Sequence, residues 1–262
     1  MKAVGLDIGS LNVKAVILDG TEPVSFAMLP ASEGTETSAR AALDEAIARS
    51  KLNGDELYIV ATGAGGKAIS FSQQQKAITT CLARGVHHLF PTARMVVDVG
   101  AETTTVLKIN DRGRVTDWAG QDKCAAGTGM FLQAMAKIMQ VSLQDMAEYS
   151  LRAKNRADIT GTCAVFAESE VISHIHRVPP TPKEEIIAGI HASMVSRIMG
   201  LLKRLGIEKE VAVVGGVALD GGFVHVLEEE LGFKVLVPEN PQMVAALGAA
   251  ILAKENLEKG VR

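Results

Sequence analysis

The sequence predicts an α/β fold built from two similar lobes. Short runs rich in valine and isoleucine alternate with stretches whose apolar residues recur at helical spacing, which is typical of α/β proteins. A pattern of strand, glycine turn and strand occurs twice, 91 residues apart (98 − 7), and a third glycine turn follows a late apolar strand. No low-complexity linker separates the copies, so we expect two lobes packed around a cleft. The length of 262 residues allows one large or two modest domains.

The predicted strands are short apolar segments, often ended by Gly or Asp. They cover residues 3–7, 13–18, 57–61, 95–99, 105–109, 211–214 and 234–237. Helical spacing of Ala and Leu predicts a helix over residues 37–50. A second predicted helix, opened by a glycine-rich turn, carries the apolar stripe Phe131, Leu132, Met135, Ile138 and Met139. The proline-rich residues 178–182 are expected to precede a further helix.

Composition excludes several classes of protein. With 47% hydrophobic and 22% charged residues and a net charge of −3, the chain is neither disordered nor a basic nucleic-acid binder. The longest apolar run, residues 243–253, is eleven residues long, against roughly 20 for a membrane span. The N-terminus reaches Asp7 too early to hold the apolar core of a signal peptide. We therefore expect a cytoplasmic protein without membrane contact.

The repeated turn contains the sequence Asp-x-Gly. Asp7 is followed by Gly9 and Ser10, and Asp98 is followed by Gly100. A carboxylate at the end of such a strand suits Mg²⁺ binding through water, while the amides of the turn suit phosphate oxygens. One such turn alone is an ordinary hairpin; its repetition favours a phosphate site.

The third turn, Gly215-Gly216, ends the apolar strand over residues 211–214. Two Asp-x-Gly hairpins followed by a late Gly-Gly turn resemble the superfamily of actin, sugar kinases and heat-shock ATPases. That resemblance implies two ribonuclease H-like lobes, covering residues 1–94 plus 248–262 and residues 95–247, with a nucleotide cleft between them. The first two turns would grip phosphates and the third would line the adenosine pocket; a purely structural Gly-Gly turn is the alternative.

A competing phosphate motif lies at residues 63–68. Gly-Ala-Gly-Gly-Lys-Ala fits G-x-G-x-x-A after a predicted strand, which would indicate a dinucleotide fold. Such a fold needs an acid about 20 residues later, and residues 57–97 contain no Asp or Glu. A P-loop fails as well, because Ala61 stands where its first glycine belongs.

Three cysteines are too few for a disulfide scaffold, and the chain has no C-x-x-C pair. Cys124 and Cys163 each precede a segment of small residues and then a predicted helix, where the helix dipole favours a thiolate. Spacing alone leaves open that both are small buried residues. Cys81 lies outside both motifs and is interpreted as structural.

Two histidines near Cys163 raise a zinc hypothesis. His174 and His176, taken with Cys124, would supply three ligands, but H-x-H spacing suits a strand better than the helix expected here. Solvated polar groups on a helix are the better interpretation. Glu168 and Glu170 are candidates for capping or tuning the helix after Cys163, and the sequence does not decide between these roles.

Four segments carry a more specific resemblance. DKCAAGTGMFL, TCAVFAESEVISHI, IIAGIHASMVSRIMGL and VVGGVALDGG occur in this order. Over essentially the whole chain they resemble the ATP-dependent activators of 2-hydroxyacyl-CoA dehydratases and the related ATPase subunits of benzoyl-CoA reductase. The resemblance implies an ATPase coupled to electron transfer, with one [4Fe-4S] cluster shared by two subunits of a homodimer. Cys124 and Cys163 match the family's ligands, and four thiolates require two chains.

The same resemblance implies partners and a nucleotide site. The partners are ferredoxin or flavodoxin as electron donor, and a 2-hydroxyacyl-CoA dehydratase, a benzoyl-CoA reductase or a related iron-sulfur enzyme as acceptor; the cofactors besides the cluster are ATP or ADP and Mg²⁺. Asp7, Asp98 and Glu102 are the candidate catalytic residues. The candidate cofactor-binding residues are Gly9, Ser10, Lys14, Gly100, Gly127, Thr128, Gly129, Gly215 and Gly216.

The turn at residues 100–104 departs from the family pattern. Family activators usually carry Gly-Gly-Gln-Asp there, whereas this chain has Gly-Ala-Glu-Thr-Thr. Glu102 remains a candidate for orienting water or the Mg²⁺ shell, although a carboxylate changes the charge beside the nucleotide. We expect ATP turnover to be altered or, in the extreme, lost, and the departure leaves a heteromeric partner open as an alternative to the homodimer.

Two other function classes remain. A small-molecule kinase on the same fold would need an aspartate base facing an acceptor pocket, and no candidate stands out beyond the nucleotide acids. A nucleotide-gated scaffold would transfer no electrons. Both leave the paired Cys124 and Cys163 unexplained.

Overall fold

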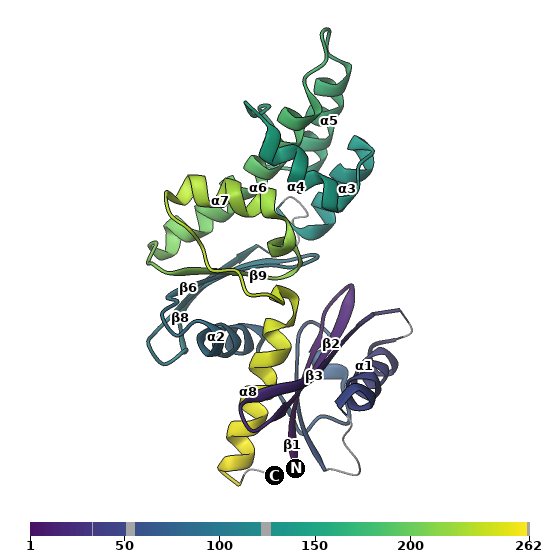
Figure 1. The fold of residues 1–262 in the computed structure, drawn as a ribbon, viewed down its shortest axis with the longest axis vertical. Coiled ribbons are helices and arrows are strands. Elements are labelled where there is room, and N and C mark those ends of the chain that lie inside the picture. The colour runs from purple at the N-terminus through teal and green to yellow at the C-terminus, as the bar shows by residue number, and fades with distance from the viewer. Residues whose placement is uncertain (33, 51–55, 122–126, 261–262) are drawn as a thin grey trace. The chain divides into compact units, whose positions relative to one another are not determined.

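A computed structural model of the chain describes residues 1–32, 34–50, 56–121 and 127–260. Its contacts divide the chain into two compact units (Figure 1). Unit 1 comprises Met1–Ala93, Ile109–Thr116 and Gln242–Arg262, and unit 2 comprises Arg94–Lys108 and Asp117–Pro241. Each unit is built on its own mixed sheet, as the repeated strand pattern predicts.

The sheet of unit 1 has the strand order β3-β2-β1-β4-β5. Its strands are β1 (Lys2–Ile8), β2 (Asn12–Asp19), β3 (Glu22–Pro30), β4 (Leu57–Thr62) and β5 (Gln74–Gln75). β1 is antiparallel to β2 and parallel to β4. Its helices are α1 (Thr35–Ser50), α2 (Ile78–Leu89) and α8 (Val244–Glu258).

The two faces of this sheet are covered by different helices. Val4, Leu6 and Ile8 of β1 pack in one core cluster with the alanines of α1, and Ala3 packs in another with α8. This follows from the alternation of side chains along a strand. α2 lies against α8.

Glycines set how closely α8 approaches its neighbours. A Cβ on Gly5 of β1 would lie 1.9 Å from the carbonyl oxygen of Ala246, and a Cβ on Gly248 would lie 1.8 Å from that of Cys81. A Cβ on Gly85 of α2 would lie 2.2 Å from the carbonyl oxygen of Val244. Because no real Cβ makes such contacts, only glycine at these positions allows the backbone of α8 to pack directly against β1 and α2.

The sheet of unit 2 has the strand order β8-β7-β6-β9. Its strands are β6 (Met95–Val99), β7 (Thr104–Ile109), β8 (Val115–Gln121) and β9 (Val211–Val214). Its helices are α3 (Gly129–Met139), α4 (Leu143–Arg152), α5 (Ala164–His176), α6 (Lys183–Leu205) and α7 (Gly221–Leu231). β6 is antiparallel to β7 and parallel to β9, which repeats the arrangement of β1, β2 and β4.

The long helix α6 forms the centre of the core of unit 2 and contacts α3, α4, α5 and α7. Its length and composition would also suit a membrane span, but 67% of its most apolar window is buried inside the protein. This burial is typical of the core helix of a folded domain.

Most predicted elements form, and the differences have local causes. Residues 234–237, predicted as a strand, contribute a single bridge between Leu236 and Ala212, so that prediction was wrong. β3 was not predicted because its inward-facing residues, Ser25 and Ala27, are small and prolines stand near both of its ends. β8 was also missed, because Val115–Gln121 lacks a regular apolar alternation.

Replacing Gly248 by alanine is expected to lower the free energy of unfolding by at least about 2 kcal/mol, because the new Cβ would collide with the backbone of α2. Urea unfolding followed by circular dichroism measures the change. Gly200→Ala is the matched control: Gly200 also lies within a helix, has no atom within 4 Å of its Cβ position, and its replacement should stabilise α6 by up to about 1 kcal/mol. Equal effects of the two substitutions would contradict this account of α8.

Candidate functional site

The first Asp-x-Gly turn connects β1 to β2. The Gly9 N–H donates to the carbonyl oxygen of Asn12 at 3.1 Å and closes the hairpin, with Ser10 exposed in the turn. Asp7 is 6% exposed, and its Oδ2 accepts a hydrogen bond from Lys14 Nζ at 3.0 Å. The structure therefore brings the predicted residues Asp7, Gly9, Ser10 and Lys14 together at one end of the unit 1 sheet.

A glycine turn after β4 lies directly against Asp7. Gly63 has a φ of 87°, and a Cβ there would lie 2.5 Å from Asp7 Oδ1. The Gly65 N–H donates to the carbonyl oxygen of Ile8 at 3.1 Å. The motif that fitted a dinucleotide fold thus borders the first candidate phosphate turn, in a sheet whose β1–β2 hairpin does not match the dinucleotide fold.

The second Asp-x-Gly turn connects β6 to β7. The Gly100 N–H donates to the carbonyl oxygen of Thr103 at 2.9 Å. Gly215, after β9, has a φ of 88°, and its Cβ position lies 2.7 Å from Asp98 Oδ1 and 2.4 Å from the carbonyl oxygen of Val99. Gly216 begins the short 3-10 helix Gly216–Leu219. Asp98, Gly100, Gly215 and Gly216 are therefore close together in unit 2.

The two units repeat this arrangement in detail. Asp7 pairs with Thr62 in the parallel β1–β4 register, and Gly63 follows; Asp98 pairs with Val214 in the parallel β6–β9 register, and Gly215 follows. Gly63 is thus the structural counterpart of Gly215. The sequence carried a signal for this correspondence, because both glycines directly follow an apolar strand. The signal was missed because the number of residues between the aspartate and the glycine differs between the two units.

The turn that begins at Gly100 is hydrogen-bonded to the first residues of α3. The N–H groups of Gly129 and Met130 donate to the carbonyl oxygens of Gly100 and Ala101, each at 2.9 Å. Thr104 Oγ1 donates to the carbonyl oxygen of Gly127 at 2.7 Å, and Thr128 is fully buried. The predicted residues Gly127, Thr128 and Gly129 therefore adjoin the Gly100 turn. Glu102 is exposed within that turn.

Cys163 lies at the N-cap position of α5, partly exposed. Its thiol makes no capping hydrogen bond, and the next turn of the helix exposes Val165 and Phe166 by 67% and 65%. Cys124, the second predicted ligand, lies outside the described residues, four positions before the N-cap of α3 at Thr128.

Cys81 differs from Cys163 in its burial. It is fully buried in α2, and burial raises the pKa of its thiol to about 12, against a smaller lowering by a hydrogen bond to Thr62. A thiol that remains protonated is a poor ligand and a poor nucleophile. The structure therefore supports a structural role for Cys81.

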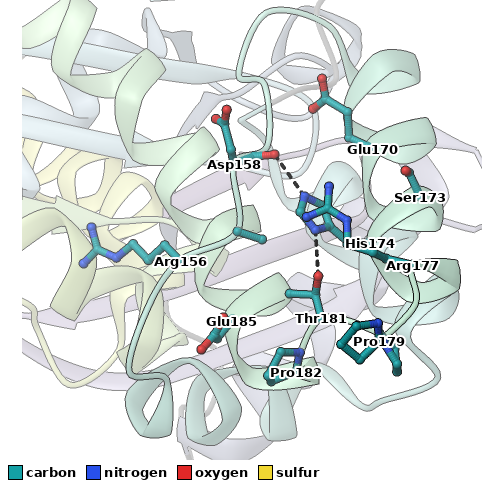
Figure 2. Close-up of a pocket in the computed structure, with 12 residues that line it drawn as sticks. Arg156, Asp158, Glu170, Ser173, His174, Arg177, Pro179, Thr181, Pro182 and Glu185 are labelled. Atoms are coloured by element: carbon teal, nitrogen blue, oxygen red, sulfur yellow. Dashed lines mark hydrogen bonds between the residues drawn. The ribbon is translucent and has the colours of Figure 1, made fainter.

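His174 is held within the protein. Its Nδ1 lies 2.9 Å from Thr181 Oγ1 and its Nε2 lies 3.3 Å from the carbonyl oxygen of Asp158 (Figure 2). A carbonyl only accepts, so Nε2 carries a proton and donates. With both ring nitrogens engaged, neither is available to zinc. Across the described ranges, no three His, Cys, Asp or Glu side chains are grouped to bind a metal.

The comparisons with known proteins agree with this geometry. The model of the BadF/BadG/BcrA/BcrD ATPase family matches residues 4–253. The chain belongs to this ATPase family. It is 39% identical over 255 residues to a 2-hydroxyisocaproyl-CoA dehydratase activator of Clostridioides difficile, covering 97% of this chain and 95% of that protein.

Solved structures support the same assignment. A structure of that activator with bound ADPNP matches at a TM-score of 0.90 and 38% identity, covering 99% of this chain and 98% of the other. Component A of the (R)-2-hydroxyglutaryl-CoA dehydratase of Acidaminococcus fermentans matches at 0.92 and 36%, covering 98% and 99%. A hexokinase of the ROK family from Thermus thermophilus matches at 0.55 and 16% identity, covering 99% of this chain and all (100%) of that one, which shows the fold alone. The predicted actin-like ATPase fold is confirmed.

Asp7→Asn and Asp98→Asn are each expected to weaken binding of Mg²⁺·ADP by about tenfold or more, because a charged hydrogen-bond or metal partner is lost. Calorimetric titration with ADP, with and without Mg²⁺, measures the effect, and the loss should be larger with Mg²⁺. Asp19→Asn is the matched control, since Asp19 lies at the far end of β2 in a surface ion pair with Lys2. Unchanged affinity in both site variants would show that neither carboxylate holds the metal.

At pH 8, iodoacetamide should leave Cys81 unmodified in the native chain and modify it once urea unfolds the protein, because burial keeps its thiol protonated. Peptide mass spectrometry reads the extent of modification. Above pH 9 the unfolded chain ionises this thiol while the folded chain does not, so the free energy of unfolding should fall between pH 9 and about 12. Cys81→Ala should reduce that fall; modification of native Cys81 at pH 8 would contradict the assignment.

Proposed function

We propose that this protein is an ATP-dependent activator that passes single low-potential electrons to a partner enzyme. The observation that carries the proposal is the similarity to a named dehydratase activator at 39% identity over nearly the full length of both chains. The electrons would pass through a [4Fe-4S] cluster shared by two copies of the chain, bound by Cys124 and Cys163 of each copy.

Of the two cysteines that each chain would contribute, the structure describes Cys163, and its surroundings suit a cluster ligand. Cys163 offers a partly exposed thiol at a helix N-terminus, without an internal hydrogen-bond partner for capping. Val165 and Phe166 beside it are apolar and largely exposed, which suits a surface covered by a second copy. Four thiolates need two cysteines from each of two chains, so the proposal requires a dimer.

The cluster, when bound, supplies one-electron redox chemistry at low potential. The chain's own residues do the rest. Asp7 and Asp98 provide the negative charge that holds Mg²⁺, and Lys14 is placed to balance that charge beside the first turn. Gly63 and Gly215 allow the backbone of each unit to lie directly against its carboxylate, where a larger residue would displace the acid.

The donor and acceptor follow from the same proposal. We infer a ferredoxin or a flavodoxin as donor, and as acceptor an enzyme of the 2-hydroxyacyl-CoA dehydratase or benzoyl-CoA reductase type. The activators among the relatives support the dehydratase class. The kinase alternative gains no support from the ROK-family hexokinase and glucokinase structures, because these are 16% and 12% identical to the chain and show the fold alone.

Iron and acid-labile sulfide, measured in anoxically purified protein together with its molar mass, test the proposal. We expect about four of each per dimer, because four thiolates bind one cluster. Cys124→Ala and Cys163→Ala should each remove the iron, because each variant takes away two of the four ligands of the dimer.

Cys81→Ala is the matched control and should retain the iron, since Cys81 is buried and protonated. Iron-free, colourless wild-type protein that still binds ADPNP after attempted cluster reconstitution would overturn the electron-transfer proposal.

A further inference from the structure

Residues 155–162, which we term the approach segment, lead directly into Cys163. Asn155 Nδ2 donates to Glu185 Oε1 at 3.1 Å, and the Ala157 N–H donates to the carbonyl oxygen of Glu185 at 2.9 Å. Figure 2 shows the next attachment, where His174 contacts the carbonyl oxygen of Asp158 at 3.3 Å. The segment is therefore attached to the start of α6 and to the end of α5.

The second half of the approach segment is held more tightly. The Thr160 N–H donates to Glu170 Oε2 at 2.6 Å, so the second turn of α5 holds the chain just before its own start. A Cβ on Gly161 would lie 2.7 Å from the carbonyl oxygen of Ser193, which places this backbone directly on α6.

Arg197 of α6 completes this attachment next to the cysteine. Its guanidinium Nη1 donates to the carbonyl oxygen of Gly161, and to that of Thr162 at 2.8 Å. These are the last two carbonyls before Cys163. One nitrogen of the guanidinium, Nη1, donates both of these charge-assisted hydrogen bonds, so it holds two successive carbonyls of the backbone at one point.

A different face of the same helix reaches Asp220, which follows the short helix after the third glycine turn. His191 is fully buried, and its Nε2 lies 3.3 Å from Asp220 Oδ2. Within the described part of the chain, no group meets hydrogen-bond geometry with either ring nitrogen of His191 or with Asp220 Oδ2. The two side chains therefore face each other, and neither of these facing atoms has another partner. Asp220 Oδ1 accepts from the Phe223 N–H at 2.9 Å and caps α7.

Asp220 is joined closely to the predicted adenosine turn. It follows the short helix Gly216–Leu219, and its N–H donates to the carbonyl oxygen of Val217 at 3.0 Å. Gly215 in turn lies against Asp98. A displacement of the Gly215–Gly216 turn would therefore reach Asp220 through four residues of continuous helix.

We propose that Arg197 and His191 are positioning residues that make α6 the connection between the Gly215–Gly216 turn and Cys163. They lie six positions apart, about 9 Å along the helix axis, on different faces. α6 is buried in the core, so it moves as one body and transmits a displacement of either contact to the other. The inference rests on the proposed function and names the residues through which the nucleotide and the cysteine influence each other.

The test measures this influence on Cys163 itself. Full-length protein freed of iron by a chelator is treated with iodoacetamide, with and without Mg²⁺·ADPNP, and the rate of modification at Cys163 is followed by peptide mass spectrometry. In the wild type we expect ADPNP to change this rate about fivefold or more, the size of a typical coupling between sites.

In Arg197→Ala the ratio of the two rates should fall to about one, while the affinity for ADPNP stays within about twofold of the wild type. Arg197→Lys should restore part of the ratio, because an ammonium at the end of the side chain retains a positively charged hydrogen-bond donor. Arg204→Ala is the matched control: Arg204 lies exposed on the same helix and should leave the ratio unchanged.

The other end of the connection is tested by Asp220→Asn. The amide oxygen still caps α7 through Phe223, while the carboxylate that faces His191 is lost. We expect the ratio to fall here too, without a large change in melting temperature. This variant also decides the question if Arg197→Ala fails to fold.

A wild-type ratio that survives in folded Arg197→Ala or in Asp220→Asn would overturn the proposal, and so would a wild-type rate that ADPNP does not change. If the wild type binds no iron, the proposed function fails, and the rate at Cys163 still decides whether α6 connects the two places.

Discussion

The positions of the Asp7 and Asp98 carboxylates depend on two glycines, Gly63 and Gly215, that lie directly against them. Each acid ends a strand that pairs in parallel with a second strand, and the glycine after that second strand occupies the space beside the carboxylate. With φ near 90° and an oxygen less than 3 Å from the Cβ position, neither Gly63 nor Gly215 can carry a side chain without moving the acid. The position of each acid is thus fixed by backbone contacts.

In unit 2 the corresponding turns are bonded to, or continue into, the beginnings of helices. The Gly100 turn accepts backbone hydrogen bonds from Gly129 and Met130, so α3 starts on the turn itself. The Gly215 turn continues into the short helix that ends at Asp220 and then into α7. A nucleotide bound at these turns would therefore act on α3 through backbone bonds and on α6 through side chains. The second of these routes is the one that we propose to reach Cys163.

The sequence predicted the elements whose signal is local. The Asp-x-Gly repeat, the Gly-Gly turn and most strands could be found because each combines an apolar run with a glycine or an acid in adjacent positions. Gly63 was assigned to a rejected motif, because its relation to Asp7 depends on pairing between β1 and β4. Arg197 and His191 had no visible role, since their partners lie 36 and 29 residues away along the chain and meet only in the folded unit.

The duplicated framework also shows where specific chemistry was added. In unit 1, Gly63 lies 56 residues after Asp7 (63 − 7); in unit 2, Gly215 lies 117 residues after Asp98 (215 − 98). α1 and α6 occupy the same place in the two copies, each preceding the strand that pairs in parallel with the acid-bearing strand. The additional length in unit 2 falls before α6 and holds α3, α4 and α5 together with Cys124 and Cys163. Because the framework alone is shared with kinases, a property that separates this family from them has to be sought in these helices and in their contacts with α6.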